Sequence, residues 1–264
     1  MATQIRLGSV VPHGVGGPQA GAIDLIYYFL LNEHSQNPHS YIFINQIGDD
    51  LDEVIIKKGK EIYINIRYPA PDDFESKNED EQNRIRLDVI HLALLRIAAK
   101  EKKLNIQILE TLKNRILENN FSFYFVFKTF INKKNNDLIA KLVIHPNPDA
   151  FEYFIHIEEQ GKLKCKLPIY NGFTNIIYVA DLFWFGKWKN DNDFVLTGKK
   201  KEIEIHIKVD SCKVKYVNLT AYEKAPRFEM FRSDISPEER ETARKDWEHS
   251  LPPAIAAFIR DANN

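Results

Sequence analysis

The chain has 264 residues, of which 44% are hydrophobic and 12% aromatic, a composition typical of globular proteins rather than of disordered ones. Its 36 basic and 37 acidic residues almost cancel, so the whole molecule has no field of one sign to steer it to nucleic acid or to an anionic membrane. The charge balance therefore excludes recognition through global charge, and any charged recognition must be local.

The first segment of interest is a loop rich in Gly and Pro at 12–18, which follows a short predicted strand. Closely spaced glycines let backbone N–H groups approach an anion, as in phosphate-binding loops. However, this segment has neither the GKS or GKT ending of a P-loop nor the glycine spacing of a dinucleotide-binding fold. We therefore interpret it as a structural turn.

A predicted helix at 23–33 comes next, with a strand as the alternative because the segment is rich in β-branched and aromatic residues. Predicted strands follow at 41–44 and 61–66, with a polar connection between them that turns at Gly59. From Asn78 the apolar residues recur with the period of a helix, and a second helical stripe follows Asn105, a good N-cap residue. Asn119 and Asn120 are suited to a left-handed exit. These features predict an antiparallel helical hairpin over 78–119.

After Asn120 the apolar period becomes two, which is typical of β-strands. Every second residue from Phe121 to Phe127 is phenylalanine, so we expect one face of a first strand to consist of phenylalanine alone. We expect a hairpin to pair 138–144 with 151–157, and a three-residue loop ending at a left-handed Gly161 to lead to a strand whose Leu163 and Cys165 face inward. Further strand pairs are predicted within 174–194, with a turn near 190–193, and at 202–209 with 212–219.

These elements predict an α+β protein, in which antiparallel β-meanders carry a helical hairpin packed on one face and a C-terminal helical appendage follows. We expect a single domain over 1–225, with the meander at about 121–219, and a helical tail over 226–264.

Cys165 and Cys212 lie in alternating apolar runs, where we expect small, buried and reduced thiols. The N-terminal residues lack the apolar core of a signal peptide. Together these features predict a cytoplasmic protein.

No catalytic residue, metal site or cofactor is predicted. Arg84, Asp88 and His91 have the i, i+4, i+7 spacing that could orient an imidazole, but we interpret them as a solvated helix face with one ion pair. The predicted hairpin places His145 and His156 at opposite ends, too far apart to share a metal. No nucleophile lies in a GxSxG elbow.

Two charged features suggest binding. An acidic cluster accompanied by exposed tryptophans would suit a basic protein partner, such as a nuclease toxin; its residues are Asp49, Asp50, Asp52, Asp72, Asp73, Glu75, Trp184 and Trp188. A basic patch is predicted on the outward face of the meander, and it consists of Lys141, Phe154, His156, Lys164 and Lys166.

The leading hypothesis is therefore a non-catalytic protein that binds another protein, in the manner of an immunity protein or antitoxin. A structural subunit of a larger assembly is the first alternative, and a hydrolase with an ungrouped His and carboxylate site is the second. We expect neither membrane insertion nor nucleic-acid binding.

Overall fold

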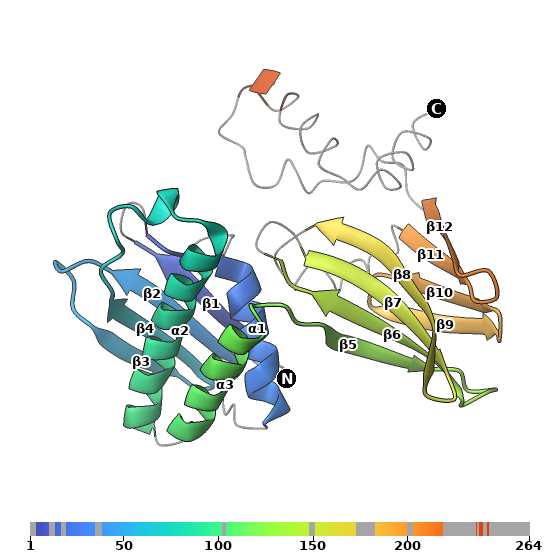
Figure 1. Ribbon diagram of the computed structural model, residues 1–264, viewed down its shortest axis with the longest axis horizontal. Helices are drawn as coiled ribbons and strands as arrows, with labels where there is room; N and C mark the ends of the chain where they lie inside the picture. Colours follow the sequence, from blue (N-terminus) through green and yellow to red (C-terminus); the bar gives the residue numbers. More distant parts are fainter. Residues whose placement is uncertain are drawn as a thin grey trace. The chain divides into compact units, whose positions relative to one another are not determined.

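The structure is a computed structural model that describes residues 4–10, 14–16, 20–34, 39–101, 104–147, 151–172, 183–199 and 203–218, with 236, 238, 239 and 242. Over these residues the chain is α+β, as predicted, and most of the strand pairs in its three sheets are antiparallel (Figure 1). The predicted tail at 226–264 lies outside the described residues apart from the four isolated positions.

The chain divides into two compact units. Unit 1 contains the residues up to Phe125 together with His145–Phe151, and unit 2 contains Val126–Ile144 and the residues from Glu152 onward. The expectation that residues 1–225 fold as one domain stays a prediction.

Unit 1 is built on a four-stranded sheet in which the central strands run parallel. Its strand order is β1 (Gln4–Ser9), β2 (Tyr41–Ile47), β4 (Glu61–Arg67) and β3 (Val54–Lys58). Helix α1 (Gly21–Glu33) connects β1 to β2, as a parallel pair requires. Strand β3 is antiparallel to β4 and lies within the segment that we predicted to be only a polar connection, so that prediction is incomplete. Gly59 forms the expected turn, with φ of 63°.

The predicted helical hairpin is confirmed as α2 (Glu79–Glu101) and α3 (Ile106–Glu118), which follow a short 3-10 helix, η2 (Phe74–Ser76). Asn105 caps α3, because its side chain accepts hydrogen bonds from the backbone N–H groups of Gln107 and Ile108. Asn120 is left-handed with φ of 47°, as expected at the helix exit.

The core of unit 1 lies between the helices and one face of the sheet. Alternate residues of β1, β2 and β4 are buried against the helices, whose own apolar stripes face them (Figure 1). The central residues of this core are Ile5, Leu7, Ile42, Ile44, Ile62, Ile64, Leu87, Ile90, Leu94, Leu109 and Leu112.

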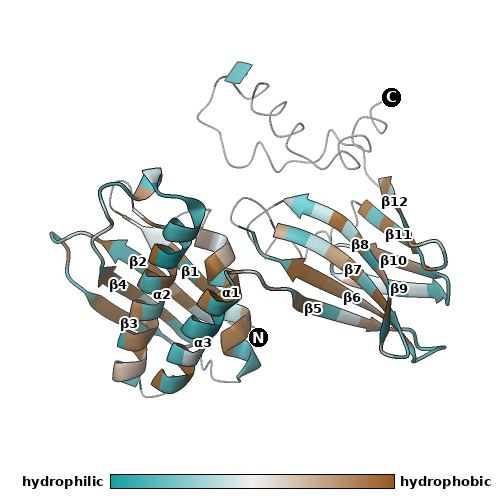
Figure 2. Ribbon diagram, viewed as in Figure 1, coloured by the Kyte–Doolittle hydropathy of each residue, from teal (hydrophilic) through white to brown (hydrophobic). Residues whose placement is uncertain are grey.

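Unit 2 is a β-sandwich of two four-stranded sheets, each in meander order. One sheet contains β5 (Phe125–Ile131), β6 (Leu138–His145), β7 (Phe151–Glu159) and β8 (Lys162–Gly172), and the other contains β9 (Phe185–Asn190), β10 (Asp193–Thr197), β11 (Ile203–Lys208) and β12 (Lys213–Asn218). Phe130 of one sheet packs on Phe194 of the other, with ring centroids 5.5 Å apart. Figure 2 shows the strands banded with hydrophobic and hydrophilic residues, the pattern of sheets with one buried face.

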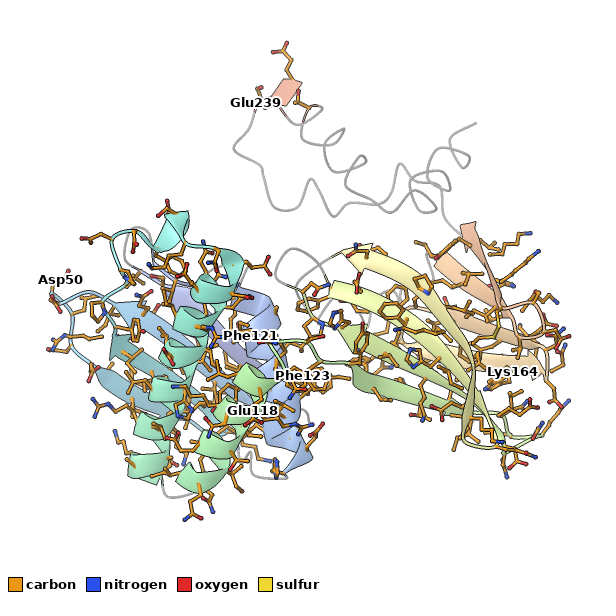
Figure 3. The ribbon with its side chains drawn as sticks, in the orientation of Figure 1. Asp50, Glu118, Phe121, Phe123, Lys164 and Glu239 are labelled. Atoms are coloured by element: carbon orange, nitrogen blue, oxygen red, sulfur yellow. A yellow bond between two sulfur atoms is a disulfide. The ribbon has the colours of Figure 1, made fainter. Side chains whose placement is uncertain are left out.

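The prediction of a strand that starts at Phe121 and has one face of phenylalanine alone is wrong. Phe121 is left-handed with φ of 59° and continues the turn that ends α3, so β5 begins only at Phe125 (Figure 3). Phe123 and Phe125 stack on each other, and Phe125 also stacks on Phe29 of α1, with centroids 4.5 Å apart. These rings therefore belong to unit 1, and the sandwich core takes Phe130 instead.

The turn between β7 and β8 also differs from the prediction. Gln160 and Gly161 both have positive φ, 52° and 75°, so they form a two-residue turn rather than a three-residue loop. Leu163 is 56% exposed instead of facing inward, whereas Cys165 and Leu167 are buried as expected. The hairpin of β6 and β7 buries its predicted inward side chains from Leu138 to Ile157.

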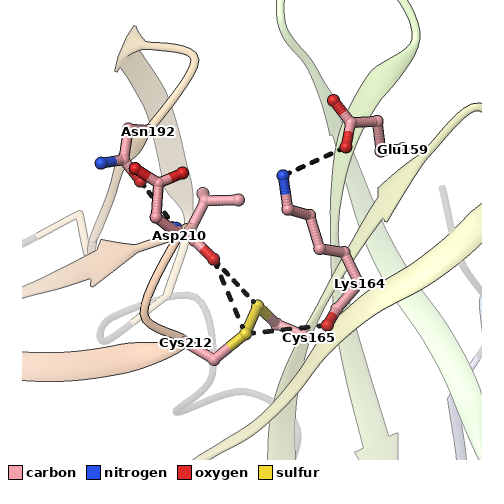
Figure 4. Close-up of a disulfide and its surroundings, with 7 residues drawn as sticks. Glu159, Lys164, Cys165, Asn192, Asp210 and Cys212 are labelled. Atoms are coloured by element: carbon pink, nitrogen blue, oxygen red, sulfur yellow. Dashed lines mark hydrogen bonds and ion pairs between the residues drawn. A yellow bond between two sulfur atoms is a disulfide. The ribbon is translucent and has the colours of Figure 1, made fainter.

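Cys165 and Cys212 form a disulfide, so the prediction of reduced thiols is wrong (Figure 4). Their Cα atoms are 5.7 Å apart, and the bond links β8 of one sheet to the turn between β11 and β12 of the other. The alternating pattern placed Cys165 correctly in the core, but burial is compatible with a thiol and with a disulfide alike.

Candidate interaction surfaces

The predicted acidic residues gather at one end of unit 1. Because β2 and β4 are adjacent and parallel, the segments that follow them, 48–53 and 68–78, leave the sheet at the same end. The first segment carries three of the predicted carboxylates and the second carries the other three, and all six residues are exposed: Asp49, Asp50, Asp52, Asp72, Asp73 and Glu75. Exposed Glu53 lies on the first segment, and exposed Glu79, Asp80 and Glu81 form the first turn of α2, directly after the second segment. We call this set the acidic end.

Two cations lie within the acidic end. Arg67 donates to the carbonyl of Leu51 at 2.7 Å and lies 3.6 Å from a carboxylate oxygen of Asp52, so it holds the 48–53 turn. Lys77 lies 2.8 Å from Asp73, and its hydrogen bond lowers the pKa of that carboxyl. The acidic end is thus ordered by its own contacts and keeps a large excess of negative charge.

The two predicted tryptophans belong to unit 2, not to the unit with the acidic end. Trp188 is a packing residue, because its indole N–H donates to the carbonyl of Phe130 at 3.0 Å and its ring packs on Phe194. Trp184 has the ammonium groups of Lys128 and Lys199 over its ring, 4.1 and 4.3 Å from its centroid. The surroundings of Trp184 are therefore basic.

The predicted basic patch is assembled on β6, β7 and β8, but much of its charge is neutralised. Lys141 pairs with Glu158 at 2.6 Å and Lys164 with Glu159 at 3.1 Å (Figure 3). Lys166 lies over the ring of Phe154, 4.9 Å from its centroid. Burial, helped by the nearby Lys166, lowers the pKa of His156 and favours the neutral imidazole.

His91 is not on a solvated face, which corrects the prediction: it is buried, with 4% of its surface exposed. Its Nδ1 lies 2.8 Å from the hydroxyl of Tyr27 on α1, and its Nε2 lies 3.2 Å from Glu110 on α3. Asp88 pairs instead with Lys113 of α3 at 2.7 Å. The periodicity of α2 placed His91 among polar residues, but α1 and α3 cover that side of the helix.

The ring of His91 is better suited to holding helices together than to catalysis. Burial lowers the pKa of His91 and so favours the neutral ring. Because the Glu110 carboxylate can only accept, the neutral tautomer that fits both contacts carries its proton on Nε2 and leaves Nδ1 to accept from Tyr27. Burial also raises the pKa of Tyr27, which is fully buried. Both ring nitrogens are thus engaged within the protein.

Asp24 of α1 is a second buried ionisable group. The N–H groups of Gln4 and Val10 bond toward β2, so by alternation that of Leu7 points to the free edge of β1, where the carboxyl of Asp24 accepts it at 3.0 Å. Burial raises the pKa of Asp24 to about 8, and the hydrogen bond from Leu7 lowers it less. The carboxyl of Asp24 therefore provides a hydrogen-bond acceptor for an N–H group on the edge strand β1, which α1 covers.

The described part of the Gly-rich loop packs on the end of β1. Val15 donates to Gln46 Oε1 at 2.8 Å and accepts from Arg86 Nε at 3.2 Å, both buried contacts. A Cβ added at Gly14 would lie 1.7 Å from Ser9 Oγ, so glycine permits this close approach. These contacts support a structural turn for 14–16; His13 lies outside the described residues.

Over the described ranges, no three His, Cys, Asp or Glu side chains are grouped so that they could hold a metal ion. No helix in the described part of the chain is long and apolar enough to cross a membrane. In comparisons with protein families, with curated proteins and with solved structures, the chain matches none.

Proposed function

We propose that this chain is a non-catalytic protein that binds a partner protein, and that the acidic end of unit 1 docks a basic surface of that partner. The observation that carries the proposal is that two acidic segments leave the same end of the unit 1 sheet, where the parallel strands β2 and β4 end. Complementary charge of this kind accelerates association and selects partners.

Contacts within unit 1 order the backbone of the acidic end in the absence of a partner. Arg67 anchors the 48–53 turn through Leu51, and its own N–H donates to Glu53 at 3.0 Å. In the second segment, η2 and the pair of Asp73 with Lys77 order the chain ahead of α2. Charges on a pre-organised backbone lose less entropy on binding than charges on a flexible tail.

Trp184 is left out of this surface because it belongs to unit 2 and is flanked by lysines. Of the residues predicted to bind a partner, the proposal thus keeps the six carboxylates and leaves out the two tryptophans. An immunity or antitoxin role, in which the partner is a basic enzyme such as a nuclease, is the form of the proposal that best uses this charge.

The test is affinity capture from the native host with the full chain and a triple variant, Asp72→Asn, Asp73→Asn and Glu75→Gln. We expect the unmodified chain to capture a basic protein whose retention falls with salt, and the triple variant to bind it about tenfold more weakly, since three exposed charges contribute roughly 0.5 kcal/mol each.

A matched control neutralises three exposed carboxylates of unit 2, with Asp137→Asn, Glu159→Gln and Asp210→Asn. The control should retain the partner. Equal binding by both triple variants, or capture that does not depend on salt, would show that the acidic end is not the docking surface.

A structural subunit of a larger assembly is the second candidate, and the outer face of the unit 1 sheet supports it. On this face the ring of Tyr41 stacks on Phe43 of the same strand, the ring of Tyr63 on the neighbouring strand is tilted beside them, and no described helix covers them. If this candidate is right, light scattering of the chain co-expressed with its neighbouring gene products will show a stable complex, and monomer alone will exclude it.

A further inference from the structure

Strand β3 is an edge of the unit 1 sheet, and the backbone N–H and C=O groups of two of its five residues point away from the sheet. Lys58 and Glu61 flank the two-residue turn at Gly59 and Lys60, so they form a hydrogen-bonded pair, and Ile56 and Val54 also bond to β4. The backbone groups of Ile55 and Lys57 therefore face outward. Lys100 confirms this direction, because its ammonium group approaches the carbonyl of Ile55 at 3.4 Å from outside the strand.

The sequence around β3 is complementary to itself when it is reversed. From Asp52 to Lys58 it reads acid, acid, three aliphatic residues, base, base, with Ile55 at the centre. In an antiparallel pair of two such segments, each acid lies opposite a base and each outer aliphatic residue lies opposite the other.

We propose that β3 pairs antiparallel with β3 of a second copy of this chain, about a two-fold axis at Ile55, so that two four-stranded sheets become one continuous sheet. Ile55 then lies opposite Ile55 of the second copy, and Val54 opposite Ile56 of the second copy. Asp52 lies opposite Lys58 of the second copy. An isologous contact of this kind closes on itself and ends at the dimer.

The outward N–H and C=O groups of β3 lie at the positions that this pairing requires. Backbone groups alternate in direction along a strand, so those of Ile55 and Lys57, and by extension those of Glu53, point away from β4. Ile55 therefore forms a hydrogen-bonded pair with Ile55 of the second copy. The weak contact of Lys100 with the Ile55 carbonyl, at an exposed site, gives way to the new ladder.

Apolar side chains that are now in water become buried by this pairing. Val54 and Ile56 are 40% and 46% exposed, and their partners on β4, Asn65 and Tyr63, place them on the outer face of the sheet. In the dimer each lies directly beside the other residue of the second copy, at the short cross-strand distance of a non-hydrogen-bonded pair.

Asp52 and Lys58, at the two ends of the segment 52–58, are the charged residues available to pair across the dimer. The side chain of Asp52 is fully exposed, with Arg67 only at 3.6 Å, and Lys58 lies over the ring of Tyr63, 5.3 Å from its centroid. Glu53 and Lys57 already have internal partners, the N–H of Arg67 and the carboxylate of Glu101. The pair of Asp52 with Lys58 therefore provides most of the charge selection, and it occurs twice in the symmetric dimer.

A five-residue strand gives a small interface, so the dimer is weak and reversible. The inference goes beyond the proposed docking function and does not rest on it, because Asp72, Asp73 and Glu75 take no part in the pairing.

The test uses the full chain and two single variants, Asp52→Lys and Lys58→Asp, in sedimentation equilibrium over about two decades of concentration. The unmodified chain should show a concentration-dependent dimer. Each variant places like charges opposite each other twice, so its association constant should fall at least about tenfold.

An equimolar mixture of the two variants provides the sharpest result. In the mixed pair, the lysine at position 52 of one chain lies opposite the aspartate at position 58 of the other, so the heterodimer should regain the unmodified association. The double variant should also dimerise. Lys162→Asp, a charge reversal on the exposed first residue of β8 in unit 2, should change nothing.

A monomer at every concentration for the unmodified chain would overturn the proposal. So would single variants that associate as well as the unmodified chain, or a mixture that stays monomeric while both variants show unchanged thermal unfolding. Both changed side chains are exposed, so a folding defect does not account for the expected pattern.

Discussion

The hydroxyl of Tyr27 lies 2.8 Å from Nδ1 of His91, deep between helices α1 and α2 of unit 1. The same imidazole reaches Glu110 of α3 through its other nitrogen, and the Tyr27 hydroxyl also lies 3.2 Å from the carbonyl of Leu109. One ring therefore joins all three helices of the layer. Because Tyr27 and His91 are both buried, no water can replace the bond between them.

Tyr27→Phe should lower the free energy of unfolding by about 1–3 kcal/mol, because it leaves Nδ1 of His91 without its donor in a buried site. Urea denaturation followed by circular dichroism measures this loss. Tyr63→Phe is the matched control, since the Tyr63 hydroxyl donates to Glu61 at a site that is only part-buried; its effect should stay within about 0.5 kcal/mol. Similar losses for the two variants would contradict the bridging role.

Asp24 makes stability depend on pH in a defined direction. Burial raises its pKa from 3.8 to about 8, so between these values the folded chain holds a proton that the unfolded chain releases. The contribution is complete below the unfolded pKa and is lost as pH rises toward about 8, with a slope of up to about 1.4 kcal/mol per pH unit.

Asp24→Asn should remove this slope while keeping an oxygen to accept from Leu7. His91 acts in the opposite direction, because its lowered pKa costs stability as pH falls below the unfolded value of 6.5. The informative quantity is thus the difference between the two proteins, from denaturation at about pH 5 and pH 8. If the variant and the unmodified chain keep parallel pH profiles, Asp24 is ionised in the fold.

Features that depend on neighbours in sequence were predictable. The helical stripe of α2, the cap at Asn105 and the hairpin of β11 with β12 need only local periodicity and local hydrogen bonds, and all three are confirmed. The exposed acidic residues were also found, because charge on loops is visible in the sequence.

Features that depend on distant partners were not predictable. That Asp50 and Asp72 share one end of a sheet follows from the parallel pairing of β2 with β4, which no local pattern encodes. Strand β3 has only three aliphatic residues between charges, too short a run to stand out. His91 was misplaced because α1 and α3 cover it, and no local pattern within α2 encodes its packing against those two helices.

The disulfide of Cys165 with Cys212 should contribute strongly to the stability of unit 2. It closes a loop across a sequence separation of 47, which corresponds to about 4 kcal/mol in the chain-entropy account. Denaturation with and without a reductant, together with the double variant Cys165→Ser and Cys212→Ser, measures this. Labelling of free thiols should find none before reduction. Free thiols in the native protein, or an unchanged unfolding midpoint after reduction, would be inconsistent with the bond.

The last prediction concerns the seam between the two sheets of unit 2, where Gly186 of β9 meets Phe130 of β5. A Cβ at Gly186 would lie 2.5 Å from the ring of Phe130 and 2.7 Å from that of Phe194. Gly186→Ala should therefore destabilise the chain by about 1–3 kcal/mol through overpacking, as measured by thermal or urea unfolding. Gly59→Ala is the contrast, because a Cβ there meets nothing within 4 Å and only the left-handed φ of 63° costs about 1–2 kcal/mol.

Double variants with Phe130→Leu distinguish the effects of the two glycine substitutions on the free energy of unfolding. Phe130→Leu removes the ring atoms nearest the new methyl group, so its cost and that of Gly186→Ala should be less than additive by at least about 0.5 kcal/mol. The same leucine should combine additively with Gly59→Ala, which lies in unit 1. Full additivity at both positions would mean that the rings of the seam move aside freely, and that the close approach of β9 to β5 does not limit the packing of this sandwich.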